Sequence, residues 1–99
     1  MKSIELRNGK LYTEAKIQQG DSFETLQVVI DTSRERTVLN SRFIQEKQLE
    51  AVSIGPLRVS SFHVLLDDMD EAGIIGLDFL VKTGAKINLD AMAISSSRT

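Results

Sequence analysis

Asp31 is the residue of this chain best placed for acid–base chemistry, because it ends an apolar run. Val28, Val29 and Ile30 precede it, and β-branched side chains of this kind favour a strand buried on both faces. A carboxylate at the end of such a strand lies at the edge of the core, where an unpaired charge is costly. Asp31 therefore either accepts hydrogen bonds from its own turn, as Asp commonly does, or serves as a reactive acid.

A second segment favours the reactive acid. Ile74-Ile75-Gly76 runs into Leu77-Asp78-Phe79-Leu80, and the pattern predicts a short helix after the glycine. With Asp31-Thr32-Ser33 and Thr37-Val38-Leu39, this segment resembles the retropepsin-like aspartic proteases. In that family a strand ends in Asp-Thr-Gly or Asp-Ser-Gly, and a hydrophobic-hydrophobic-Gly block follows before a short helix. The resemblance covers roughly residues 11–89.

The resemblance implies a mainly β fold, a small retropepsin-like β-barrel with one or two short helices. We expect a single domain over residues 1–99, with a core at about 11–94 and a frayed tail at 95–99. The local patterns predict several elements. These are a hairpin over 11–30, a helix over 42–48 with Phe43 and Ile44 turned inward, strands at 51–54 and 57–66 with Leu57, Val59 and Ser61 on one face of the latter, a helix over 76–82 ending at Gly84, and strands at 85–89 and 91–94.

Aspartic protease chemistry requires two carboxylates that share a proton, whereas the chain has one such motif. In the family the second Asp comes from an identical subunit across a two-fold axis. The resemblance thus implies a homodimer with a catalytic Asp31 in each chain, supported by Thr32 and Ser33, and a peptide or protein substrate. The side chains expected to line the cleft are Arg34, Glu35, Ile54, Ile74 and Ile75.

Three features depart from the family pattern. Ser33 stands where the family has Gly, and its Cβ narrows the backbone options. Arg34 stands where a small residue is usual. Its guanidinium either lies beside Asp31 and favours the ionised carboxylate, or points outward and pairs with Glu35 or an acid of the partner subunit. The long glycine-bearing hairpin called the flap is shortened or missing, and Ser53-Ile54-Gly55-Pro56 is the candidate for a short replacement.

Composition excludes several other functions. The 12 basic and 14 acidic side chains give a net charge of −2 and do not favour nucleic acid, and the chain has no cysteine. The single histidine, His63, has no neighbouring His or Cys, so we expect no metal site, and no cofactor is implied. No segment is typical of a signal peptide or a membrane span. We therefore expect a cytoplasmic protein without a membrane partner.

Two functions remain open at this point. One is a homodimeric aspartic endopeptidase, in which activity is weak or restricted because of the altered turn and the short flap. The other is a catalytically inactive retropepsin-fold module that binds peptides or dimerises, since a fold does not by itself fix a function.

Overall fold

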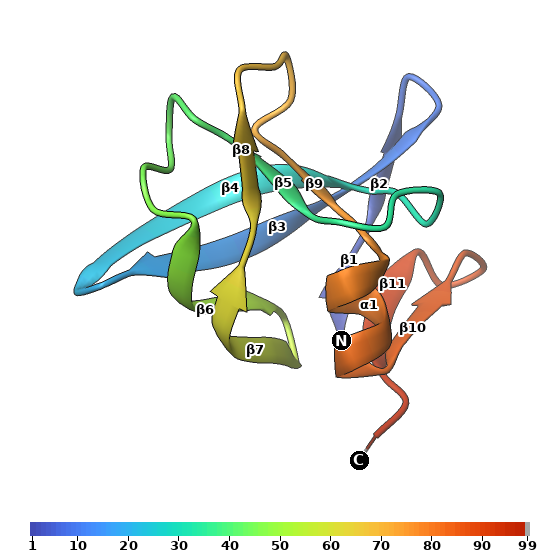
Figure 1. Cartoon of the computed structure of the whole chain (residues 1–99). Coiled ribbons are helices and arrows are strands. Elements are labelled where there is room, and N and C mark those ends of the chain that lie inside the picture. The colour runs from blue at the N-terminus through green and yellow to red at the C-terminus, as the bar shows by residue number, and fades with distance from the viewer. Residues whose placement is uncertain (99) are drawn as a thin grey trace.

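The computed structural model, which describes residues 1–98, is built around a long twisted hairpin (Figure 1). Its strands are β3 (Lys10–Gln19) and β4 (Ser22–Ile30), which pair antiparallel from Leu11↔Ile30 to Gln19↔Ser22. Thr13, Ala15 and Ile17 are buried on one face of β3, because alternate residues of a strand point to the same side. The β3–β4 turn lies at one end of the molecule, and the end of β4 lies toward the other (Figure 1).

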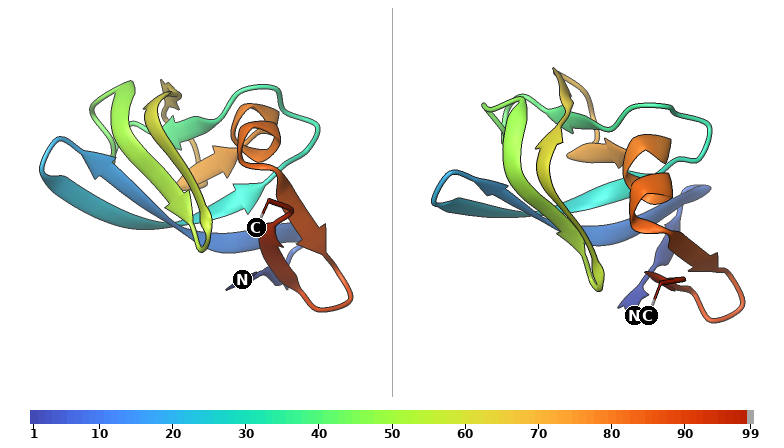
Figure 2. Two further views of the ribbon diagram at one scale, coloured as in Figure 1. Left: turned by 90° about the horizontal axis from the view of Figure 1, so that it is seen from below. Right: turned by 60° about the horizontal axis from the view of Figure 1, so that its bottom comes forward.

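The remaining strands extend the hairpin into two sheets. The larger sheet is eight-stranded, in the order β7-β6-β3-β4-β9-β5-β8 with β2 added against β3; the smaller has the order β1-β11-β10. Their bounds are β1 Lys2–Ser3, β2 Glu5–Arg7, β5 Val38–Asn40, β6 Gln48–Ile54, β7 Leu57–His63, β8 Leu65–Asp67, β9 Gly73–Ile75, β10 Ala85–Asn88 and β11 Ala93–Ser96. The large sheet curls around its apolar face as a half-barrel (Figure 2).

The helix α1 (Leu77–Thr83) closes one end of the curled sheet and packs against β7 and β10. Phe79 is fully buried there and meets the Phe62 ring edge-on, with ring centroids 5.9 Å apart. The helix ends at Gly84, whose φ of 63° is left-handed, as the predicted C-cap requires. The mainly β fold with a short helix is therefore confirmed.

The predicted helix over residues 42–48 is wrong. Phe43 and Ile44 each donate an N–H to the Asn40 carbonyl, which makes only one turn. The next two N–H groups, of Gln45 and Glu46, bind the Gln19 side chain instead of continuing a helix, and β6 begins at residue 48. Ile44 is fully buried as expected, whereas Phe43 is 44% exposed.

Two smaller expectations also change. Ser61 has a φ of +52° and is exposed, so the inward face of β7 passes from Val59 to Phe62 and Ser61 does not share it. The expected tail is partly strand, because Ser95 and Ser96 pair with β10. Arg98 donates to the carbonyls of the last turn of α1, Lys82 O at 2.6 Å among them. Thr99 lies outside the described residues.

No helix among residues 1–98 has the length and apolar character needed to cross a membrane.

Candidate active site

The main chain of Asp31 is held where the large sheet ends. Asp31 follows β4 directly, and its N–H donates to the Ile75 carbonyl at 3.0 Å, one step beyond the parallel pairing of β4 with β9. Val28, Val29 and Ile30 are all buried, as the β-branched run predicts. The side chain of Asp31 itself is partly exposed. The sheet therefore fixes the backbone and leaves the carboxylate at the surface.

The carboxylate of Asp31 is braced by its own turn. Its Oδ1 accepts a hydrogen bond from the Ser33 N–H at 2.9 Å and another from the Ser33 hydroxyl at 2.6 Å. These two donors, hydroxyl first, hold the pKa of Asp31 below its ordinary value, and the positive charge of Arg34 adds to the effect. The turn contact expected of an ordinary Asp is thus present, in a form that stabilises the ionised acid.

Ser33 fits its turn without backbone strain. The non-glycine residues with positive φ among residues 1–98 are Asn8, Ser61 and Met92. Ser33 is not one of them, so the backbone at this position does not require glycine. The consequence of having serine at this position is chemical, because its hydroxyl adds a donor to the acid.

The loop that follows Asp31 is fastened to the start of α1. The Leu77 N–H donates to Arg34 O at 2.8 Å, and the Asp78 N–H donates to Glu35 O at 3.0 Å. The side chains of Arg34 and Glu35 are exposed, and neither forms an ion pair within residues 1–98. These two residues therefore hold the loop through their main chains.

Asp78 and Thr37 form a buried polar link between the same two segments. Both Asp78 oxygens accept the Thr37 N–H, at 3.1 and 3.0 Å, and Oδ1 also accepts the Thr37 hydroxyl at 2.7 Å. That hydroxyl accepts the Gly76 N–H at 3.1 Å. Arg36 Nε lies 3.5 Å from Asp78 Oδ2. No local sequence pattern indicated that Thr37 and Asp78 would be partners.

Gly76 permits the close approach of loop and helix. A Cβ at this position would lie 2.9 Å from Arg34 O and 2.9 Å from the Arg36 carbonyl carbon, which are backbone atoms. Gly76→Ala should therefore lower the free energy of unfolding by about 1–3 kcal/mol. The expected readouts are a thermal midpoint lower by several degrees and faster hydrogen exchange at the amides of Leu77 and Asp78.

Gly20→Ala is the comparison for this substitution. A Cβ at Gly20 would meet nothing within 4 Å, although its φ of +55° disfavours alanine by about 1 kcal/mol. Gly20→Ala should leave the exchange of the Leu77 and Asp78 amides unchanged. Equal exchange of these amides in Gly76→Ala and the parent protein would contradict the packing argument.

A pocket of about 400 Å³ opens beside Asp31. It lies between the β2–β3 turn, the end of β4 and the β8–β9 loop, and Thr32 and Ile74 line it as well as Asp31. Ile54 and Ile75, expected to line the cleft, are instead fully buried in the core. Ile75 acts on the site through its carbonyl, which accepts the Asp31 N–H. The other lining residues are Gly9, Lys10, Leu11, Val29, Ile30 and Glu71.

The flap candidate at residues 53–56 does not reach this pocket. It is the turn between β6 and β7, and a Cβ at Gly55 would lie 2.7 Å from the Lys2 Cβ, so the turn packs on the N-terminal strand. The connection over residues 41–47 does not cover Asp31 either, because the Gln19 side chain holds it at the far end of the β3–β4 hairpin. That end is roughly 25 Å from Asp31.

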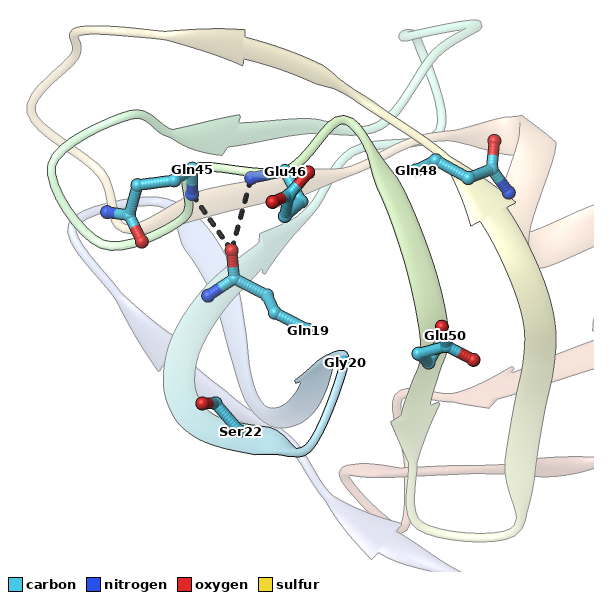
Figure 3. A pocket seen from close by; sticks show the side chains of 7 residues that line it. All are labelled: Gln19, Gly20, Ser22, Gln45, Glu46, Gln48 and Glu50. Carbon is cyan, nitrogen blue, oxygen red and sulfur yellow. Dashed lines mark hydrogen bonds between the residues drawn. The ribbon is translucent and has the colours of Figure 1, made fainter.

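A second pocket, of about 440 Å³, lies at that far end (Figure 3). Gln19 points into it and accepts the N–H groups of Gln45 and Glu46 at 2.9 and 3.1 Å. Gly20, Ser22, Gln48 and Glu50 complete its lining. It contains none of the residues that the sequence singled out, and within residues 1–98 no group of three His, Cys, Asp or Glu side chains is arranged to hold a metal ion.

Two solved structures that share this arrangement of strands are retropepsin-like domains. The structure is similar to the retroviral protease-like domain of Ddi1 from Leishmania major, with a TM-score of 0.67 and 17% identity over 94% of this chain and 89% of that one. It is also similar to a retropepsin-like aspartic protease from Rickettsia conorii, with a TM-score of 0.66 and 16% identity over 89% and 82% of the two chains. No protein-family model and no curated protein sequence matches the chain. The chain therefore has the retropepsin-like fold.

Proposed function

We propose that this protein is a homodimeric aspartic endopeptidase in which each chain supplies one Asp31. The proposal rests on the position of Asp31. This residue is partly exposed at the end of β4 and lines a pocket of about 400 Å³. The pocket combines this acid with apolar walls, as sites for peptide side chains commonly do. The retropepsin-like fold supports the same function.

Two Asp31 carboxylates brought together would share one proton, because close like charges cannot both ionise cheaply. The ionised member would then take a proton from a water that attacks the peptide carbonyl. The protonated member would donate a hydrogen bond to the carbonyl oxygen as its negative charge develops. The proton taken from the water would then pass to the peptide nitrogen as the C–N bond breaks, which releases the acid and amine products and restores the pair. The pKa of Asp31 in the single chain is lowered, first by the Ser33 hydroxyl. This shift favours the ionised carboxylate that takes the proton from water.

One face of the molecule has the features that such a dimer needs. The loop after Asp31, α1 and the β10–β11 hairpin gather at the same end of the molecule (Figure 1). Leu77 and Val81 lie one turn apart on α1 and are 38% and 67% exposed. Within residues 1–98, β10 pairs only with β11, so its outer edge is free for a strand of a second copy.

The N-terminal strands are less suited to an interchain sheet than β10 is. Within residues 1–98, β1 pairs only with β11 and β2 only with β3, so each also has a free edge. These strands are two and three residues long, however, whereas β10 has four residues. We therefore assign the interchain sheet to the β10 edge. Thr32 is exposed beside Asp31, and we assign to it a hydrogen bond across the two-fold axis.

The assay that tests this proposal is peptide hydrolysis measured over a range of protein concentrations. Because one chain holds only half of the dyad, the activity per chain should rise with concentration and level off where sedimentation shows complete dimer formation. The double variant Leu77→Asp, Val81→Asp should lower the activity per chain at a fixed concentration. The protein concentration at which activity rises should increase by about tenfold or more. Activity per chain that is constant through the dimerisation range would contradict the proposal.

A further inference from the structure

Glu71 ties the β8–β9 loop to β3 at the mouth of the Asp31 pocket. Its Oε2 accepts a hydrogen bond from the Tyr12 hydroxyl at 2.6 Å and another from Lys10 Nζ at 3.0 Å. The Arg7 guanidinium lies 4.1 Å from the centre of the Tyr12 ring. Lys10 and Glu71 both line the pocket.

The loop that carries Glu71 is rigidly placed. The fully buried Asn40 side chain donates to the carbonyls of Met69 and Glu71, at 2.8 and 3.0 Å. Arg42 donates to the same Met69 carbonyl at 2.7 Å. The position of the Glu71 carboxylate beside the pocket is therefore fixed from both of its sides, by the loop backbone and by β3.

Lys10 is the polar group of this cluster that a ligand can reach. The Glu71 side chain is 20% exposed and the Lys10 side chain is 52% exposed. A lysine ammonium has three donors, and only one is used in this cluster, on Glu71. The carboxylate of Glu71 raises the pKa of Lys10, so the ammonium remains protonated.

The walls between Lys10 and Asp31 are apolar. Leu11, Ile30 and Ile74 line this part of the pocket. A side chain that enters would lay an aliphatic stem against these residues and bring its tip to the ammonium. A tip that accepts hydrogen bonds can use the free donors of Lys10, whereas a cationic tip would meet a like charge.

We infer that Lys10 is a specificity-determining residue that selects a substrate side chain with an aliphatic stem and an anionic tip, glutamate above methionine and methionine above lysine. The inference rests on the proposed function, because it assigns the substrate of the same pocket. Glu71 reduces the preference for an anionic tip, because its negative charge partly offsets the positive charge of Lys10.

The test is a set of octapeptide mixtures with Glu, Met or Lys fixed at one position and the other positions randomised. For the parent protein we expect a kcat/KM about fivefold higher for the Glu set than for the Met set at one position beside the cleaved bond, and lowest for the Lys set. Lys10→Met should bring the Glu-to-Met ratio to about one. Glu71→Gln should raise that ratio, because the ammonium then has no neighbouring anion.

Opposite shifts of one ratio distinguish selection from a merely structural role, in which both variants would affect all peptide sets equally. The same sets are passed over immobilised Asp31→Asn protein to measure retention without cleavage. Retention that favours Glu in the absence of any hydrolysis by the parent protein would refute the endopeptidase proposal and leave the selection by Lys10 intact. Cleavage or retention without preference for Glu, or a ratio unchanged in Lys10→Met, would overturn the inference.

Discussion

Asp31→Asn is expected to lower peptide hydrolysis by about 1,000-fold or more, because it removes both members of the proposed acid pair at once. The amide has the shape of the carboxylate, and its oxygen can still accept the two hydrogen bonds that Ser33 now donates. The turn should therefore keep its conformation. The comparison of kcat for the two purified proteins, at a concentration where both are dimers, measures the effect.

Asp21→Asn serves as the matched control for this substitution. Asp21 is an exposed acid in the β3–β4 turn, at the far end of the hairpin from Asp31. It should keep the parent rate within about twofold, as surface substitutions away from a site usually do. Hydrolysis that survives Asp31→Asn, in a preparation free of other peptidases, would exclude Asp31 as the catalytic acid.

Removal of the Ser33 hydroxyl should give a gain of activity at neutral pH of about three- to tenfold, which corresponds to the net contribution of one hydrogen bond. The hydroxyl favours ionised Asp31, so its loss raises the pKa of Asp31 toward the ordinary value. The pair would then keep its shared proton to a higher pH, and both limbs of the rate profile should move to higher pH.

Ser33→Ala and Ser33→Gly together identify the cause. Both remove the hydroxyl, and only the glycine variant also removes the Cβ. Equal shifts of the two pH profiles would assign the effect to the hydrogen bond at 2.6 Å. A gain confined to Ser33→Gly would indicate crowding by the Cβ. A profile that stays unchanged in both variants would contradict the proposed role of the hydroxyl.

The same pKa shift has a consequence for stability. Because the folded state holds the pKa of Asp31 below its ordinary value, the contribution of this acid is present above the ordinary pKa and disappears as the pH falls through the lowered one. The Ser33 variants should therefore lose less stability on acidification than the parent protein does.

The parts of the fold that the sequence predicted are those specified locally. The β3–β4 hairpin follows from alternation along β3 and from the β-branched end of β4. The end of α1 follows from Gly84, whose left-handed φ of 63° suits glycine. The position of Asp31 follows from the same local pattern, because the strand and its turn are contiguous in sequence.

The parts that the sequence missed depend on partners far along the chain. The segment over residues 42–48 has helical spacing, but the Gln19 side chain takes its N–H groups and β6 pairs with β3. Glu71 meets Tyr12 and Lys10 from 59 and 61 positions away. No local pattern shows that an acid in a polar loop will accept hydrogen bonds from a distant strand. The part of the pocket wall formed by Lys10 and Glu71 was therefore not predictable.

In the proposed dimer, two chains contribute one acid each to a single site, and this sharing can be measured. A mixed dimer of the parent chain and Asp31→Asn, isolated with two different affinity tags, tests it most directly. This dimer should cleave peptides at about 1% of the parent rate or less, since its single site holds only one carboxylate. A rate of about half that of the parent dimer would mean that each chain works alone, and would exclude a site shared by two chains.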